Sequence, residues 1–370
     1  MKLYDFMKNY KLLSLFSCLL LVTSFAIGCI GCGEDDEDDN GDSEVYDANE
    51  ILDHYANNVV LAIYTDLDTK AGELLTAVKA LEENTTQANL ETAQEAWKAT
   101  RIPWETSEAF LFGPVDTQGL DPALDSWPVD HVNLQSVIDS DNELTVDYVS
   151  GLEVTQKGFH TIEFLLFREG DQRMASDITE REMEYLISST MNLKDSTFQL
   201  QNAWATPGEN FASVVATAGV EDNSVYPSQS AGLQELVNGM ITIADEVANG
   251  KLSDPYNEEN TTKVESQFSF NSIADFQNNI RGIQAVYTGN YNDDGPGLDD
   301  FVSGEDSDLD SRFKSEIMVA IDAIGAIPDP FRDSITENRP TVQNAIDAVE
   351  TVHQTLKQNI LTLVEESEFN

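Results

Sequence analysis

Residues 49–81 read NEILDHYANNVVLAIYTDLDTKAGELLTAVKAL, and the spacing of their apolar side chains decides the fold class. Apolar residues recur at intervals close to three, four or seven, which is the pattern of an α-helix with one buried face. The positions are Ile51, Tyr55, Val59, Ala62, Leu67, Leu74, Val78 and Leu81. Because Asn84-Thr85-Thr86 breaks the run, the sequence predicts a long helix that begins near Asn49 and ends before Asn84.

The same pattern continues towards the C-terminus, interrupted by polar loops. Further helices are predicted at about 88–112, 151–167, 179–205, 209–218, 229–249, 271–288, 311–326 and 340–366. Pro103 is expected to kink or split the first of them. Residues 113–131 contain three prolines and two glycines, which predicts an ordered loop rather than a helix. Since no stretch alternates as a β-hairpin does, we expect an all-α fold built of helical bundles.

A short internal similarity bears on the domain organisation. Residues 158–163 (GFHTIE) and 282–287 (GIQAVY) share a glycine followed by residues at the same spacings, and each stretch lies in an apolar helix. We therefore expect two bundle-like halves, at residues 47–210 and 211–370. Because the match is short, an internal duplication stays an open alternative.

The first 32 residues have the layout of an export signal. Lys2, Lys8 and Lys11 precede an apolar run from Leu12 to Ile27. That run is shorter than the roughly 20 apolar residues of a transmembrane helix, and its basic flank fits a secretory signal. Residues 1–32 are therefore predicted to be a signal peptide that directs the protein to the cell envelope.

Two cysteines are candidates for a lipid anchor. Ala26-Ile27-Gly28-Cys29 and Ile30-Gly31-Cys32 both resemble the bacterial lipobox, in which a small residue precedes an acylated cysteine. Several acyl chains on Cys29 or Cys32 would hold a protein at a membrane where one chain barely does. The acidic residues 33–46 are expected to form a disordered tether. The protein is thus predicted to be an outer-membrane lipoprotein, either periplasmic or surface-exposed.

Charge and cysteine use exclude several functions. The formal net charge is −47, so the chain repels phosphate and we expect no nucleic-acid partner. The charge either keeps an exposed surface soluble or attracts cations. All three cysteines lie within the first 32 residues, so the folded part has no disulfide, no thiolate metal site and no cysteine nucleophile.

The strongest candidate for chemistry is the pair His160 and Glu163. On a helix they are three residues apart and project from one face, as imidazole and carboxylate ligands do in metal sites of helical bundles. The surrounding residues are apolar, and a carboxylate is costly to bury there unless it is paired or coordinated. In the alternative interpretation, the two side chains simply hydrogen-bond to each other or to Lys157.

A second stripe of polar residues strengthens the metal interpretation. Arg101, Glu105 and Glu108 follow one another at spacings of four and three in an aromatic-rich helix. We expect Glu105 or Glu108 to complete a site with His160 and Glu163, with Arg101 orienting the ligands. The alternative is a salt bridge between Arg101 and Glu105 on a solvent-facing surface.

These stretches together resemble the imelysin-like family. GFHTIEFLLF at 158–167 is similar to its G-x-H-x-x-E signature, and the segments 97–114 and 125–128 resemble the motif and loop of its first half. The segments 275–282 and 297–298 resemble its second half, so the likeness spans roughly residues 47–366 in the expected order. The resemblance implies an all-helical fold with a site between two halves, an envelope location and a role in iron uptake.

The resemblance also implies that Gly158, Asp125 and Asp275 support the ligands. One departure is Phe159, where the family often has histidine or another polar residue, which leaves the metal undecided. Iron is our first expectation, because one histidine among carboxylates suits a harder cation, with zinc or calcium as alternatives. Calcium-like loops at 290–295 and 306–310 lack the full ligand pattern.

The residues favour binding over catalysis. The family includes an insulin-cleaving metallopeptidase, but none of the four histidines lies in the H-E-x-x-H or H-x-x-E-H pattern of a zinc peptidase. We therefore expect metal or metal-chelate binding in metal acquisition, with an envelope transport partner. The alternatives are a metal-dependent peptidase and a non-catalytic surface scaffold.

Overall fold

The computed structural model describes residues 46–168, 170 and 173–369, which belong to one compact unit. Within these residues helices dominate, and Tyr46 and Phe369 form one isolated β-bridge rather than a sheet. The predicted all-α fold is confirmed. The predicted signal peptide, with Cys29 and Cys32, lies outside the described residues. In the described part, no helix is both long and apolar enough to cross a bilayer.

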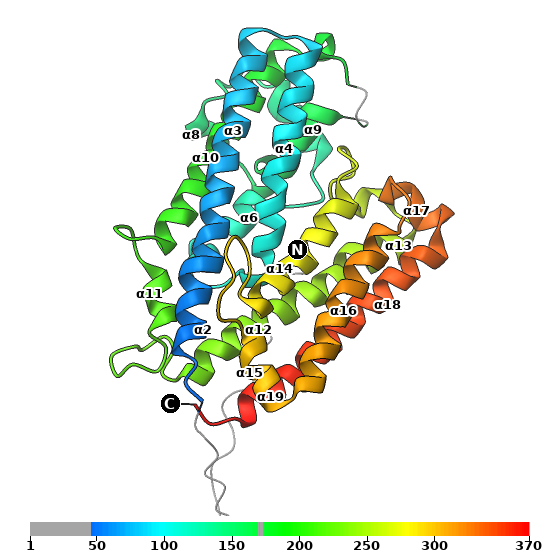
Figure 1. Cartoon of the computed structure of the whole chain (residues 1–370). Coiled ribbons are helices and arrows are strands. Elements are labelled where there is room, and N and C mark those ends of the chain that lie inside the picture. The colour runs from blue at the N-terminus through cyan, green and yellow to red at the C-terminus, as the bar shows by residue number, and fades with distance from the viewer. Residues whose placement is uncertain (1–45, 169, 171–172, 370) are drawn as a thin grey trace, which may run out of the picture. The chain divides into compact units, whose positions relative to one another are not determined.

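Three long helices pack side by side as the first helix group: α3 (Leu61–Glu83), α4 (Gln87–Ser107) and α10 (Glu180–Trp204) (Figure 1). α2 (Asn49–His54) and a π-helical segment, η1 (Tyr55–Val60), run directly into α3. The helix predicted from the first apolar repeat is therefore confirmed over residues 49–83. Its repeat positions, from Ile51 to Leu81, are buried, apart from the half-buried Ala62.

Four further helices form the second helix group: α12 (Gln229–Asp245), α14 (Ser272–Thr288), α16 (Ser307–Gly325) and α18 (Arg339–Thr355) (Figure 1). Two of them continue through π-helical segments. The continuations are η5 (Glu246–Leu252) and α13 (Ser253–Glu258) after α12, and η7 (Leu356–Ile360) and α19 (Leu361–Glu366) after α18. A π-helical turn often marks a functional position, and η5 carries one of the residues of the site described below.

The two groups meet where α4 packs on α14 and where the short 3-10 helix η2 (Glu108–Phe110) packs on α12. Glycine permits the close approach at α14, because a Cβ on Gly282 would lie 2.3 Å from the carbonyl oxygen of Thr106. The contact sets the acidic end of α4 directly against α14. A division of the chain near residue 210 into two related halves stays a prediction.

Two predicted boundaries are wrong. Residues 113–131 form two short helices, α5 (Pro114–Thr117) and α6 (Leu120–Leu124), because Pro114 is tolerated in a first helical turn and apolar side chains face the core. The buried helix predicted from residue 151 begins only at Phe159, as α9 (Phe159–Phe167). Gly158 has φ 79°, a conformation that a right-handed helix cannot contain.

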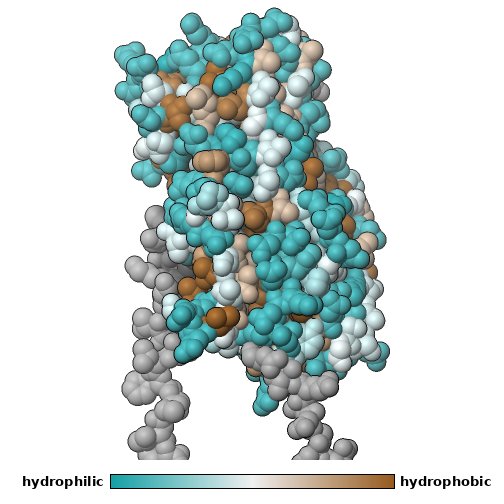
Figure 2. Space-filling model, turned by 60° about the vertical axis from the view of Figure 1, so that its left-hand side comes forward, coloured by the Kyte–Doolittle hydropathy of each residue, from teal (hydrophilic) through white to brown (hydrophobic). Residues whose placement is uncertain are grey.

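Pro103 does not split its helix, since α4 continues to Ser107. The remaining short helices are α7 (His131–Ile138), α8 (Val146–Ser150), η3 (Val154–Gln156), η4 (Ala175–Asp177), α11 (Phe211–Ala216), η6 (Thr261–Lys263), α15 (Leu298–Glu305) and α17 (Phe331–Glu337). Figure 2 shows a face covered mainly by hydrophilic side chains with hydrophobic ones scattered among them. That surface agrees with the strongly acidic composition.

The close packing of α14 on α4 predicts that Gly282→Ala destabilises the fold. The new methyl group would force the two backbones apart, so we expect the free energy of unfolding to fall by about 1–3 kcal/mol. Gly304→Ala in α15 is the matched control, because a Cβ there meets nothing within 4 Å. We expect that control to be neutral or stabilising by less than about 1 kcal/mol in denaturant unfolding. Equal losses in both variants would contradict the packing argument.

Candidate metal centre

A buried polar cluster lies where the two helix groups meet. Its members are Arg101 and Glu105 on α4, Glu108 on η2, Asp125 directly after α6, His160 and Glu163 on α9, Lys251 on η5, Glu265 after η6, and Asp275 and Asn279 on α14. All are at least nine-tenths buried when the side chain is considered. The structure thus brings together every site residue that the sequence predicted in the folded part, and adds Lys251, Glu265 and Asn279.

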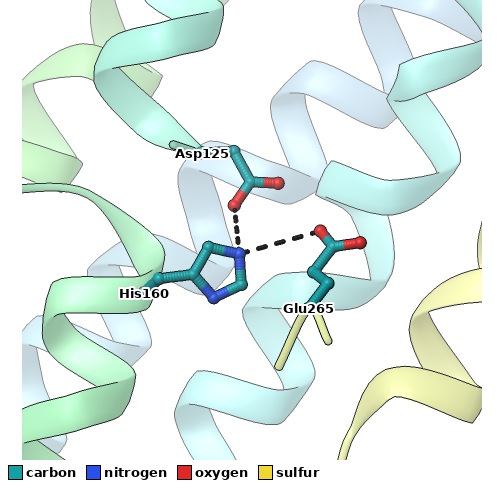
Figure 3. A group of neighbouring side chains, drawn as sticks. All are labelled: Asp125, His160 and Glu265. Carbon is teal, nitrogen blue, oxygen red and sulfur yellow. Dashed lines mark ion pairs between the residues drawn. The ribbon is translucent and has the colours of Figure 1, made fainter. Parts of the chain in front are cut away.

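Gly158 sets the contact between Asp125 and His160. A Cβ on Gly158 would lie 2.3 Å from the carbonyl oxygen of Leu124, so only glycine lets the start of α9 reach the end of α6. As a result, His160 Nε2 lies 3.0 Å from Asp125 Oδ1. Figure 3 shows that the Asp125 carboxylate points at this ring nitrogen.

Glu163 holds the other side of the imidazole. Its Oε2 lies 2.9 Å from His160 Nδ1, and Lys157 instead donates to the Ser150 carbonyl. The hydrogen bond between His160 and Glu163 therefore forms, as the simpler interpretation expected. In a neutral ring this bond favours the tautomer with hydrogen on Nδ1, which leaves the Nε2 lone pair directed away from Glu163.

Glu163 also builds the turn that delivers Glu265. Its Oε1 accepts hydrogen bonds from the backbone N–H of Phe268 and Ser269 and from Ser269 Oγ, at 3.0, 2.8 and 2.8 Å. The turn is strained, because Ser266 and Phe270 have φ values of 50° and 57°. With both oxygens engaged in this way, Glu163 orients the site, and its predicted role as a ligand stays untested.

Asp125, His160 and Glu265 form the group with metal-ligand geometry. One ligand atom from each lies within 4.8 Å of the other two, and both carboxylates point at the same nitrogen (Figure 3). His160 Nε2 is 3.7 Å from Glu265 Oε1. Among the described side chains, this buried nitrogen is one of the few polar atoms without a hydrogen bond, because its 3.0 Å contact with Asp125 is poorly directed. One imidazole nitrogen between two carboxylate oxygens fits a metal ion.

Arg101 ties the carboxylates together. Its guanidinium pairs with Asp125 at 2.6 Å, with Glu265 at 2.9 Å and with Glu105. Arg101 and Glu105 are both 0% exposed, so the pairing expected between them forms but does not lie on a solvent-facing surface. Burial opposes the charge of Arg101, yet the carboxylates outweigh it and raise its pKa well above the usual range. The residue therefore stays charged and holds the ligands in place.

Glu105 and Glu108 contact Lys251 and, among the described residues, are not part of the metal-ligand group around His160. The ammonium group lies 3.3 Å from Glu105 Oε2 and 2.6 Å from Glu108 Oε2. Asn279 Nδ2 donates to the same two oxygens, at 2.7 and 2.6 Å. The two glutamates predicted as ligands thus surround a neighbouring ammonium group. Sequence spacing cannot reveal Lys251 or Asn279, because they come from helices far along the chain.

Burial makes part of the cluster retain protons. It raises the pKa of Glu108 to about 7, against the pull of Lys251 and with the help of nearby carboxylates. It also raises the pKa of Asp275 to about 6, against the pull of Arg101. Both carboxyl groups therefore keep their protons to a higher pH than exposed carboxyl groups do, because burial disfavours the ionised form.

The pKa values of His160, Asp125 and Glu265 shift in the direction that favours the charged forms. Burial opposes ionisation of Asp125, but Arg101 and His160 outweigh it and hold the pKa well below its usual value. At Glu265, burial also opposes ionisation, but Lys251 and His160 outweigh it and lower the pKa to about 2. Burial disfavours the imidazolium form of His160, yet Asp125, Glu163 and Glu265 raise its pKa well above the ordinary value. The local excess of carboxylates therefore favours any cation, whether a proton or a metal ion.

Glu108→Gln should change how the stability of the metal-free protein depends on pH. A carboxyl group whose pKa is raised to about 7 on folding binds more protons in the folded state, so stability falls as the pH rises from about 4.5 to 7. We expect the variant to lose about 1–3 kcal/mol less than the wild type over this range. Unfolding at pH 5 and pH 8 measures it, with the exposed Glu143→Gln as control. Parallel curves for Glu108→Gln and wild type would contradict the assignment.

Comparisons with known proteins agree with this architecture. Iron-regulated protein A of Synechococcus elongatus is 28% identical over 356 residues, which cover 93% of this chain and 94% of that protein. A crystal structure described as a candidate iron-regulated protein A precursor of Parabacteroides distasonis matches with a TM-score of 0.78 and 27% identity, over 87% of this chain and 95% of that one. An imelysin-like protein from Psychrobacter arcticum 273-4 shares the fold, with a TM-score of 0.70 at 14% identity, over 85% and 94% of the two chains.

The sequence model of the imelysin family, a peptidase family by its designation, matches residues 60–357. The match includes both helix groups and every residue of the buried cluster. The chain therefore belongs to the imelysin family.

Proposed function

We propose that this protein binds a metal ion, iron in the first place, at Asp125, His160 and Glu265, and that it serves metal acquisition in the cell envelope. One observation carries the proposal: the buried His160 Nε2 lacks a hydrogen bond and lies between two carboxylate oxygens. Glu163 fixes the ring from behind, which is how outer carboxylates support histidine ligands.

The donor set supports iron over the other candidates. One nitrogen and several carboxylate oxygens suit an ion of intermediate hardness, whereas structural zinc prefers more nitrogen or sulfur donors and calcium prefers oxygen alone. Two similar proteins carry iron regulation in their names. A metal chelate in place of a bare ion needs room outside this buried triad, so the bare ion fits the described conformation better.

The other histidines give no support to a conventional zinc peptidase. His54 contacts the Gly289 carbonyl, His131 packs against Phe164 and Phe268, and His353 lies beside Glu350. Within the described residues, the metal triad therefore has a single imidazole. A peptidase remains the second outcome of the experiment below, and a non-catalytic surface scaffold the third.

His160→Ala should abolish metal binding. Because this substitution removes the nitrogen donor, we expect no detectable uptake of Fe²⁺ under anaerobic conditions, measured by calorimetry and metal analysis on the full chain. Glu163→Gln, which loosens the ring, should weaken binding about 10- to 100-fold. The matched control is His353→Ala, since His353 is also a buried histidine three residues from a glutamate.

The same preparations decide between the alternatives. Cleavage of an unfolded protein that requires metal and is lost in Glu163→Gln would favour the peptidase. Wild-type protein that binds no metal and cleaves nothing would leave the scaffold. Unchanged Fe²⁺ binding by His160→Ala would refute the assignment of the triad.

We also propose that a lipid anchor at Cys29 or Cys32 holds the protein at the outer membrane, where a transport partner collects the metal. The basic start, the apolar run and the two lipobox-like stretches support this location. Labelling of cells with a radioactive fatty acid should give a labelled wild-type protein, and one of Cys29→Ser or Cys32→Ser should lose the label. Labelling that survives the double substitution would contradict the anchor.

A further inference from the structure

Glu265 lies between two cation positions, one beside the His160 imidazole and one at the Lys251 ammonium group. Its Oε1 lies 3.7 Å from His160 Nε2, 2.9 Å from the Arg101 guanidinium and 3.3 Å from Lys251 Nζ. Oε2 lies 3.0 Å from Lys251 Nζ. In centres with two metal ions, a carboxylate in this position bridges the ions, and helical bundles commonly build such centres from glutamates.

The group of carboxylates around Lys251 has the composition of a cation site. Carboxylate oxygens of Glu105, Glu108 and Glu265 surround the ammonium group at 3.3, 2.6 and 3.0 Å. The Lys251 side chain is only 1% exposed, and the Trp127 ring lies 6.0 Å from Nζ. Arg101 shares Glu105 and Glu265 with the ammonium group, so three carboxylates face two positive charges and a local excess of negative charge remains.

A polar atom without a hydrogen bond lies beside the same carboxylates. Asn279 is 0% exposed and its Oδ1 has no hydrogen-bond partner, while its Nδ2 donates to Glu105 and Glu108. An amide oxygen is an acceptable ligand for a hard cation. Rotation of the Asn279 amide would therefore turn a donor into a ligand, so the position of the ammonium group would suit an ion once Lys251 is absent.

The local backbone explains how Lys251 reaches this position. It lies in η5, a π-helical segment in which the wider turn shifts side chains relative to a regular α-helix. A regular continuation of α12 would present a different face at this position. The three glutamates around the ammonium group come from α4, from η2 and from the turn after η6, whereas the ammonium group itself comes from η5.

We propose that the Lys251 ammonium group occupies the second cation position of a carboxylate centre laid out for two ions, and so restricts the centre to one metal ion. The inference rests on the proposed function of the Asp125, His160 and Glu265 triad. Its consequence is that the protein lacks the second ion on which two-metal hydrolysis depends, which agrees with binding rather than turnover. Lys251 thus determines how many metal ions each chain binds, and it acts on the bound ion through the shared carboxylate of Glu265.

The experiment counts Mn²⁺ ions per chain. Equilibrium dialysis of the full-length protein gives the stoichiometry, and electron paramagnetic resonance distinguishes an isolated Mn²⁺ from an exchange-coupled pair. We expect one ion in the wild type and two coupled ions in Lys251→Met, with the first bound at least tenfold more tightly. Lys251→Arg keeps the positive charge and should bind one ion. Lys194→Met, which breaks a partly buried pair with Asp68 elsewhere, should also bind one.

A charge-balanced variant protects the test against loss of folding. Lys251→Met combined with Glu108→Gln removes one positive and one negative charge, so the buried net charge is unchanged. We expect this variant to bind a second ion, at least tenfold more weakly than Lys251→Met does, because two carboxylates remain. If Lys251→Met does not fold, the comparison of the double variant with the wild type decides.

The outcomes separate the two proposals. One ion in the wild type and one in both methionine variants would overturn the role of Lys251 and leave the triad intact. Two ions in the wild type would also overturn it. No ion in the wild type would refute the proposed function itself.

Discussion

The guanidinium of Arg101 contacts carboxylates from four separate segments, and the junction of the two helix groups depends on it. Its partners are Glu105 on the same helix, Asp125 after α6, Glu265 in the turn after η6 and Asp275 on α14. Only a planar group with several donors can serve so many acceptors at once. Because both groups of helices contribute acids, removal of Arg101 would leave uncompensated buried charges on each side, which costs several kcal/mol.

This polar junction replaces apolar packing at the centre of the fold, and such a replacement has an energetic cost. Buried ion pairs rarely stabilise a protein more than well-packed hydrophobic side chains of the same volume do. Here the carboxylates outnumber Arg101 and Lys251, and burial raises the pKa of Glu108 and Asp275 accordingly. A ligand that binds only the folded state stabilises it by mass action, so a bound cation would offset the cost. The energetic cost of the cluster therefore supports the proposed binding of a cation.

The sequence predicts the local features well and the long-range ones poorly. The helices follow from apolar spacing, and His160 and Glu163 are found because they lie one turn apart in an apolar helix. Asp125 and Asp275 were expected only as supports, and the structure brings Asp125 into direct contact with the imidazole. Glu265 lies in a polar turn without a periodic signal, and Lys251 in a π-helical segment that no spacing rule anticipates. Their positions depend on how distant helices pack, and one sequence does not encode that packing in any local pattern.

The distribution of the triad over the fold bears on whether the site captures an ion or turns over a substrate. The side chains of His160 and Asp125 are each 3% exposed and that of Glu265 is 2% exposed, so an extended polypeptide cannot reach the centre in the described conformation. His160 lies on a helix, whereas Asp125 and Glu265 lie at a helix end and in a turn, and Arg101 ties both carboxylates to α4. A peptidase needs a cleft that admits a polypeptide beside preorganised groups, so a centre this deeply buried supports the proposed binding of an ion over the cleavage of a protein substrate.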